Sequence, residues 1–167
     1  MIDSKTQVSE QHSVLFICAA NQCRSVMAEY ALKSLVKNRS SHPESWRIES
    51  AGVHAFNGMN ATPFAVQAIE DIQEDASHHV SRIFTCDLGA NFALILCMQK
   101  YQQSLIQNTC PALSDRVYLV SEMEEKADEI VDPVGMSLTT YKETMNLLLS
   151  IFKRGWSYME KLSSLHN

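Results

Sequence analysis

The feature that most constrains the fold is an uninterrupted apolar run, Phe92 to Met98. A strand buried on both faces of a parallel sheet has this continuous hydrophobicity, whereas a strand with one solvated face alternates. Val14–Ile17 is a shorter run rich in β-forming residues, and further strands are expected at Arg47–Ala51 and Val117–Val120. Parallel strands need long crossover connections, so we expect helices between these runs.

Helical signals occupy the segments between the runs. Helices are expected from the residues after Cys23 to about Asn38, from Thr62 as N-cap, and over residues 100–107. Ser137 is placed to cap one long helix that runs to about Leu162, with only Gly155 to weaken it. We therefore predict an α/β fold: a single three-layer domain whose central, mainly parallel four-stranded sheet is flanked by helices, doubly wound and flavodoxin-like.

Length and charge limit the domain organisation and the partners. The chain of 167 residues has the size of one domain, and we expect a flexible tail over residues 1–12 and the domain over residues 13–167. The net charge is −5 and no basic run occurs, so neither nucleic acid nor a membrane surface is an expected partner. The apolar runs are too short to span a bilayer and no secretion signal precedes them, which predicts a cytoplasmic protein.

The five cysteines, at positions 18, 23, 86, 97 and 110, are odd in number and lack the close pairs of a zinc site. We expect reduced thiols, with Cys86, Cys97 and Cys110 packing as small apolar residues. The histidines show no ligand spacing to one another or to the acids, so no metal is predicted.

The turn after the first run brings together residues suited to an anion. Cys18 follows the run directly, so we expect it at the carboxyl edge of the sheet, where such folds bind ligands. Backbone amides in a turn that opens a helix converge on an anion, and the same field favours a thiolate at Cys18. Arg24 offers two parallel donors for phosphate oxygens, and Ser25 can hydrogen-bond the thiolate. The pattern predicts an anion site beside a nucleophilic cysteine.

The segment "CAANQCRSV" resembles the signature C-x-G-N-x-C-R-S-P of the low-molecular-weight protein tyrosine phosphatases and their arsenate reductase relatives. The resemblance implies Cys18 as nucleophile and a phosphate-binding loop that consists of Ala19, Ala20, Asn21, Gln22, Cys23, Arg24 and Ser25. Ala20 replaces the family glycine and Val26 the family proline. If the loop needed a positive φ at Ala20, the strain would be on the order of 1 kcal/mol and would weaken the grip on phosphate.

Further segments extend the resemblance from about residue 13 to 162. "IESAGVHAF" is similar to the family S-A-G segment, which implies that Ser50 supports the loop asparagine and that Phe56 lines the substrate cleft. "VDPVGMSLTTYKET" is similar to the family D-P loop, which implies Asp132 as the general acid and Val134 beside the cleft. The implied reaction is hydrolysis of phosphotyrosine on proteins through a phosphocysteine, in which Arg24 holds the phosphate without cofactor or metal.

Two alternatives stay open at this point. A thioredoxin-coupled arsenate reductase would need a further cysteine pair; Cys86 and Cys97 are available, although their spacing differs from that branch. A phosphate-binding interaction module with weak activity would follow if Ala20 disabled the loop. Within the phosphatases, Gln22 stands where the arginine-phosphatase branch carries threonine, which disfavours that branch.

The same resemblance leaves two interpretations of Cys23. It packs beneath the loop, or it forms a reversible disulfide with Cys18 that protects the nucleophile from over-oxidation. The expected partner is a phosphotyrosine-containing protein, and the chain is expected to be a monomer or a weak dimer.

Overall fold

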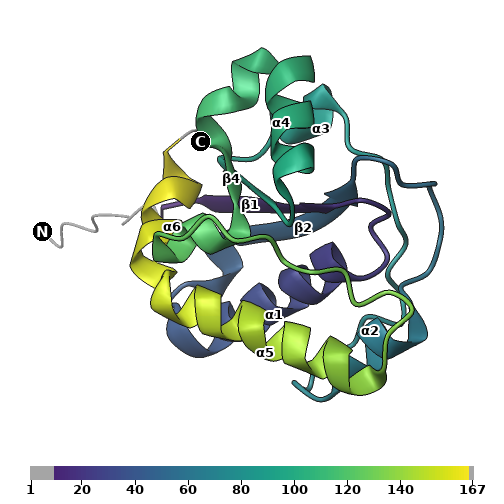
Figure 1. The fold of residues 1–167 in the computed structure, drawn as a ribbon. Helices are drawn as coiled ribbons and strands as arrows, with labels where there is room; N and C mark the ends of the chain where they lie inside the picture. The colour runs from purple at the N-terminus through teal and green to yellow at the C-terminus, as the bar shows by residue number, and fades with distance from the viewer. Residues whose placement is uncertain (1–9, 166–167) are drawn as a thin grey trace, which may run out of the picture.

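A parallel sheet of four strands forms the centre of the computed structural model, which describes residues 10–165 (Figure 1). The strands are β1 (His12–Cys18), β2 (Trp46–Gly52), β3 (Leu94–Cys97) and β4 (Val117–Leu119), in the order β2-β1-β3-β4. β1 pairs in parallel with β2 and with β3. Because the chain leaves β1 toward β2 and returns on the other side to β3, the carboxyl end of β1 lies at the switch in strand order. The predicted fold class is confirmed.

Helices cover both faces of the sheet. They are α1 (Arg24–Arg39), α2 (Pro63–Glu70), α3 (Cys86–Gly89), α4 (Lys100–Thr109), α5 (Leu138–Arg154) and α6 (Trp156–Ser164), with 3-10 turns η1 (Pro43–Ser45), η2 (Pro111–Arg116) and η3 (Val120–Glu124). Figure 1 shows α1, α2 and α5 below the sheet and α3 and α4 above it. Thr62 takes the predicted N-cap position, but its side chain makes no capping bond. No helix within residues 10–165 is long and apolar enough to cross a membrane.

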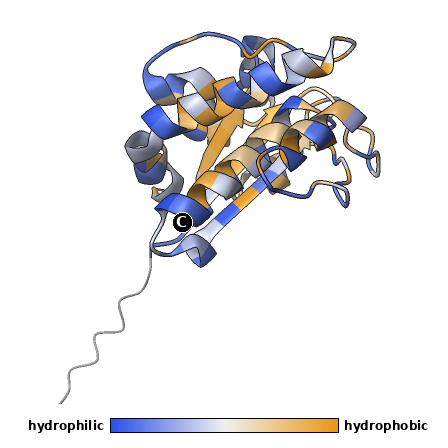
Figure 2. Cartoon of the chain, turned by 90° about the horizontal axis from the view of Figure 1, so that it is seen from below, coloured by the Kyte–Doolittle hydropathy of each residue, from blue (hydrophilic) through white to orange (hydrophobic). Residues whose placement is uncertain are grey.

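The side chains of β1 divide the core into two layers. Val14 and Phe16 belong to the cluster that α1 and α5 cover, whereas Leu15 and Ile17 belong to the cluster that includes residues of α4 and η2. Figure 2 shows the hydrophobic colour concentrated on the strands between the helices. The expected burial of both sheet faces is therefore confirmed, and it fixes the position of the loop that follows β1.

The amino-terminal boundary differs from the prediction. His12, which the sequence pattern places in the tail, begins β1. Its ring stacks on Trp46 with centroids 4.3 Å apart, and its Nδ1 lies 2.8 Å from Ser163 Oγ. A histidine contributes little to a hydrophobicity pattern, so its buried contacts gave no signal. Residues 1–9 of the predicted tail lie outside the described residues.

The prediction of one long carboxyl-terminal helix is wrong. α5 ends at Arg154 and α6 begins at Trp156. A Cβ at Gly155 would lie 2.4 Å from the carbonyl oxygen of Met123, so glycine lets the backbone of η3 approach the chain at this break. The apolar spacing continues across the break because both helices cover the same core cluster.

The expectation that the cysteines are all reduced is also wrong. Cys86 at the start of α3 and Cys110 after α4 form a disulfide, with their Cα atoms 5.6 Å apart. The two residues are 24 positions apart, and no local pattern in the sequence shows that the ends of α3 and α4 meet. Cys97 is free and buried, as expected for a packing residue.

Candidate active site

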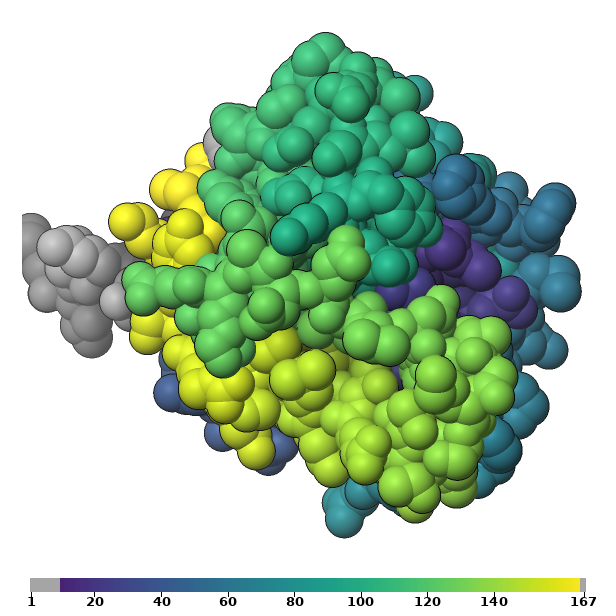
Figure 3. Space-filling view, viewed as in Figure 1, coloured from purple at the N-terminus to yellow at the C-terminus, as the bar shows by residue number. Residues whose placement is uncertain are grey.

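The loop between β1 and α1 lies at the carboxyl edge of the sheet. Cys18 ends β1 and is buried, and Arg24 begins α1. The space-filling view shows this purple segment in a recess, between the blue segment after β2, the teal segment near residue 100 and the light-green segment after residue 130 (Figure 3). The loop therefore forms the floor of the recess.

Within the loop, Asn21 has the left-handed backbone conformation, with a φ of 56°. Asparagine tolerates this conformation better than most residues. The turn directs the backbone N–H of Asn21 to Cys18 Sγ, which it approaches at 3.3 Å. Ala20 does not take a positive φ, so the condition under which it would strain the loop is not met.

The side-chain amide of Asn21 is fully buried, and its contacts fix its orientation. Its Oδ1 accepts from the backbone N–H of Arg82 at 3.0 Å. Its Nδ2 donates to Ser25 Oγ at 3.0 Å and to Ser50 Oγ at 2.9 Å. Ser50 in turn donates to Glu29 Oε2 at 2.6 Å. The predicted contact between Ser50 and the loop asparagine is thus present.

Ser25 connects this network to the cysteine. Its Oγ lies 3.0 Å from Cys18 Sγ while it accepts from Asn21. A hydroxyl has one hydrogen to donate, and here that hydrogen is free to point at the sulfur. The backbone N–H of Asn21 and the hydroxyl of Ser25 therefore both lie within hydrogen-bond distance of Cys18 Sγ.

Gly52 also shapes the site, although no motif in the sequence assigns it a role. A Cβ at this position would lie 2.4 Å from the carbonyl oxygen of Ala19 and 2.8 Å from the backbone N of Asn21. Beyond it, the N–H groups of Val53 and His54 donate to the carbonyls of Cys18 and Ala19. The end of β2 thus lies directly against the loop and holds its shape.

Arg24 reaches the opposite wall of the recess. Its guanidinium is 2% exposed and donates to Gln99 Oε1 at 2.7 Å, to the carbonyl of Ile130 at 2.9 Å and to Asp132 Oδ2 at 2.8 Å. Asp132 is 44% exposed, and its other oxygen accepts from the N–H of Val134 at 3.2 Å. The structure therefore brings the predicted arginine and the predicted acid into direct contact.

Gln99 is a second residue that sequence reasoning missed. It precedes α4, where it forms a reciprocal capping arrangement with the fully buried Gln102. The amide of Gln99 is held in place for Arg24 as a result. One signal in the sequence could have indicated Gln99. It directly follows the apolar run, so it is expected at the same edge of the sheet as Cys18.

Comparison with known proteins agrees with this geometry. The model of the low molecular weight phosphotyrosine protein phosphatase family matches residues 13–162. The chain belongs to this family. It is 32% identical to a probable low molecular weight protein-tyrosine-phosphatase, EpsP of Ralstonia nicotianae, over 81% of this chain and 88% of the relative. It is 30% identical to the protein-arginine-phosphatase of Bacillus subtilis, over 84% and 92% respectively.

A solved structure of the arginine phosphatase YwlE superposes with a TM-score of 0.80 at 29% identity, covering 89% of this chain and 95% of that one. That protein is a cysteine-to-serine mutant whose active-site serine carries a phosphate. Family membership places this chain among cysteine-dependent phosphatases. The arsenate reductase alternative is not favoured, since Cys97 lies fully buried in β3 and Cys86 is bonded to Cys110 rather than to Cys97.

Two more side chains bear on the phosphatase loop. His79 Nε2 lies 2.8 Å from the carbonyl oxygen of Asn21, a contact that no sequence motif indicated. Cys23 is buried under the loop, and burial, Asp132 and Cys18 raise its pKa to about 12. The Cys23 thiol is therefore neutral at physiological pH. Both Cys18 and Cys23 are free thiols here, so their reversible disulfide stays a prediction.

The predicted cleft residues lie at the surface. Phe56 is 82% exposed, and Val134 is 57% exposed. Gln22 is partly buried, and its side chain donates to the carbonyl oxygen of Asn60 at 2.9 Å. Among residues 10–165, no group of three or more His, Cys, Asp or Glu side chains is arranged to hold a metal ion.

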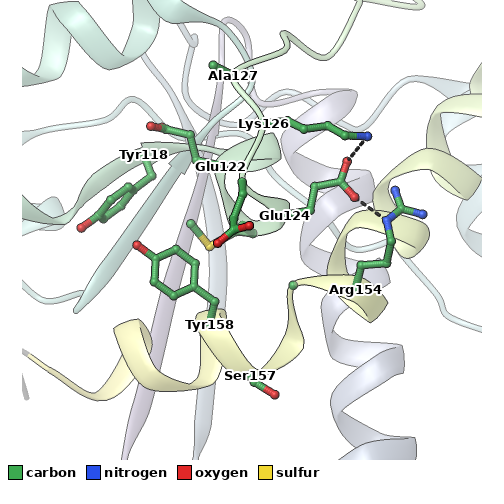
Figure 4. Close-up of a pocket in the computed structure, with 11 residues that line it drawn as sticks. Tyr118, Glu122, Glu124, Lys126, Ala127, Arg154, Ser157 and Tyr158 are labelled. Atoms are coloured by element: carbon green, nitrogen blue, oxygen red, sulfur yellow. Dashed lines mark hydrogen bonds and ion pairs between the residues drawn. The ribbon is translucent and has the colours of Figure 1, made fainter.

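A separate cavity of about 940 Å³ lies where η3 meets α6 (Figure 4). Tyr118 and Tyr158 line it, and Glu124 forms ion pairs there with Lys126 and Arg154. None of the residues that line this cavity belongs to the phosphate loop, and Asp132 does not line it either. It is therefore distinct from the candidate active site.

Proposed function

We propose that this protein hydrolyses phosphotyrosine on proteins, with Cys18 as nucleophile, Arg24 as the phosphate-binding cation and Asp132 as the general acid. The ion pair between Arg24 and Asp132 is the observation that supports this most. It brings an acid from 108 positions away in the chain to the residue that closes the phosphate loop. Nucleophile, cation and acid then surround one recess.

In the first step the Cys18 thiolate, which has already given up its proton to solvent, forms a bond to phosphorus while the bond from phosphorus to the tyrosine oxygen breaks. Asp132 donates its proton to the leaving oxygen. Arg24 and the loop amides stabilise the negative charge on the three oxygens that stay with phosphorus.

The second step regenerates the enzyme. Water attacks phosphorus and gives a proton to the Asp132 carboxylate, and the bond between sulfur and phosphorus breaks to release inorganic phosphate. The hydroxyl of Ser25, 3.0 Å from Cys18 Sγ, stabilises the departing thiolate. No electrons are transferred, so no redox partner is required.

The choice of phosphotyrosine rests on the family model and on Gln22, which differs from the threonine of the arginine-phosphatase branch. The named arginine phosphatase among the relatives makes phosphoarginine the comparison substrate. The proposed partner is a phosphotyrosine-containing protein, and a monomeric or weakly dimeric state stays a prediction.

The deciding experiment measures hydrolysis of phosphotyrosine and phosphoarginine peptides, with EDTA present, by wild type, Cys18→Ser and Cys97→Ala. Cys97 is a buried cysteine outside the loop and serves as the matched control. We expect metal-independent turnover of the phosphotyrosine peptide that is lost in Cys18→Ser and kept in Cys97→Ala. Preferred hydrolysis of phosphoarginine would overturn the substrate class, and turnover by Cys18→Ser would overturn the mechanism.

A cytoplasmic location stays a prediction, and the disulfide provides its test. Disulfides persist mainly in oxidising compartments. In a cytoplasmic protein, alkylation during cell lysis should label both Cys86 and Cys110. Protection of both residues would place the mature chain in an oxidising compartment instead.

A further inference from the structure

An aromatic pair lies beside the phosphate loop. The rings of His54 and Tyr101 are nearly parallel, with an interplanar angle of 6° and centroids 6.2 Å apart. His54 follows β2, and Tyr101 lies in the first turn of α4, after β3. β1 lies between β2 and β3 in the sheet. His54 and Tyr101 come from the segments that follow these two outer neighbours, so their contact passes over the end of β1, where the phosphate loop begins.

A backbone hydrogen bond of His54 and the position of Tyr101 in the chain place the pair beside the loop. The backbone N–H of His54 donates to the carbonyl of Ala19 at 2.9 Å, one residue after the nucleophile. Tyr101 follows Gln99 by two positions, and Gln99 binds the guanidinium of Arg24 at 2.7 Å. The Tyr101 hydroxyl accepts a hydrogen bond from Gln102 at 3.2 Å, and Gln102 in turn forms the capping arrangement with Gln99. The backbone of His54 thus contacts the start of the loop, and Tyr101 belongs to the turn that presents Gln99 to Arg24.

The small side chains of the loop leave room beside this pair. Ala19 and Ala20 carry only a methyl group each, and Ala20 is exposed. Tyr101 is 44% exposed, so part of its side chain is open to contact with a ligand. The stack orders both rings in advance, which lowers the entropy that binding would otherwise cost.

The other candidate walls are more exposed or lack an aromatic ring. Phe56 is 82% exposed, and the segment after Asp132 offers Val134 and Gly135 rather than an aromatic ring. An aryl group held by its phosphate on the loop needs a flat apolar surface at its side. The His54–Tyr101 pair offers two rings in mutual contact, on segments that reach the loop through the His54 backbone and Arg24 through Gln99.

We propose that the His54–Tyr101 pair is a specificity wall of the substrate cleft, which contacts the aromatic ring of the phosphorylated residue. This inference rests on the proposed phosphotyrosine function. It predicts that the pair contributes to binding of aryl phosphates and contributes nothing to binding of phosphate itself.

The test compares the affinities of benzylphosphonate and inorganic phosphate, measured by calorimetry without turnover. In Tyr101→Leu we expect benzylphosphonate to bind roughly fivefold more weakly, the scale of one aromatic contact. His54→Ala should weaken it by a similar factor, because the Tyr101 ring loses its support. Inorganic phosphate should bind each variant as it binds wild type. Tyr101→Phe, which keeps the ring, should retain the wild-type preference for benzylphosphonate.

Tyr158→Leu is the matched control, since Tyr158 is 42% exposed and lies in α6 away from the loop. It should leave both affinities unchanged. Unchanged benzylphosphonate binding in Tyr101→Leu would overturn the inference, as would an equal loss for phosphate, which would show a purely structural role. Because the readout is binding, absence of catalysis in wild type would refute the proposed function without deciding this inference.

Discussion

The phosphate loop and the segment that carries Asp132 are held in opposite ways. Cys18, Asn21 and Ser25 are all buried. The Asn21 amide donates to Ser50 in β2 and to Ser25 in α1, and it accepts from the Arg82 backbone. Asp132 lies in a segment whose side chains are largely exposed, with Val131 at 71%. The Asp132 carboxylate is held by hydrogen bonds from the Arg24 guanidinium and from the backbone N–H of Val134.

The difference matches the two tasks proposed for these regions. A phosphate cradle works by keeping its donors in place before the substrate arrives, so burial and a saturated network suit it. An acid that gives a proton to one group and takes it from another must adjust its contacts during the reaction. Solvent exposure and a single ion pair allow that adjustment.

The largest expected effect comes from Asp132→Asn, which removes the acid but retains an oxygen for Arg24. We expect kcat/KM to fall by about 10² to 10⁴. Because the ion pair is exposed on one side, unfolding free energy should change by less than about 1 kcal/mol. Kinetics and urea unfolding of the same preparation measure both. A loss of activity below tenfold would remove Asp132 from the mechanism.

Gly52→Ala should affect the buried region in both activity and stability. The new Cβ meets backbone atoms of the loop, which cannot turn aside, so we expect a loss of about 1–3 kcal/mol in unfolding free energy. The affinity for phosphate and kcat/KM should fall at least tenfold. Gly58→Ala is the control. It introduces backbone strain without a steric clash, since Gly58 has φ +86° and a new Cβ there would have no atom within 4 Å.

That control should cost about 1 kcal/mol in stability and leave phosphate affinity intact. If both glycine variants bound phosphate like wild type, the contact of β2 with the loop would be unimportant for the cradle.

The thiol of Cys23 provides a pH-dependent test of contact between the two regions. Burial, Asp132 and Cys18 raise its pKa from 9.0 to about 12, so the reactive thiolate is scarce at pH 8. Alkylation of Cys23, followed by peptide mass spectrometry, should be slow at pH 8. It should quicken in Asp132→Asn, which removes one of the charges that raise the pKa.

The raised pKa of Cys23 also determines whether the stability of the fold rises or falls with pH. The unfolded chain releases the Cys23 proton near pH 9, whereas the folded chain holds it until about pH 12. Stability linked to this group should therefore decline as the pH rises above 9. Rapid alkylation of Cys23 at pH 8 in the folded protein would contradict both expectations.

The smallest effect is expected for Ala20→Gly, which restores the family residue. Because the positive φ belongs to Asn21, glycine brings no relief and adds freedom to the unfolded chain. Stability should fall by about 0.4–1 kcal/mol, and kcat/KM should stay within about twofold. A gain in activity of tenfold or more would show that alanine does restrict the loop.

The fold and the loop could be predicted because their signals are local. A continuous apolar run, a cysteine at its end and an arginine six positions later are all visible in one stretch of chain. The contact between Asn21 and Ser50 was accessible only through the resemblance to the family, since nothing in either segment alone specifies it.

The missed features depend on approaches between distant segments. Gly52, at the end of β2, is required because the backbone of the loop after β1 lies against it. Gly155 is required because the carbonyl of Met123 lies against it. The disulfide forms because two helix ends converge, and neither cysteine has a sequence neighbour that indicates it. Gln99 binds Arg24 across 75 positions with a side chain that carries no motif.

The orientation of the Asn21 amide has a consequence for proton movement. Its Nδ2 donates in two directions, toward Ser25 and Cys18 on one side and toward Ser50 and Glu29 on the other. An amide NH₂ donates hydrogen bonds but does not accept and pass on a proton as a hydroxyl can. Asn21 therefore interrupts the series of hydroxyl groups between Cys18 and the Glu29 carboxylate, so a proton cannot pass from one to the other through this amide.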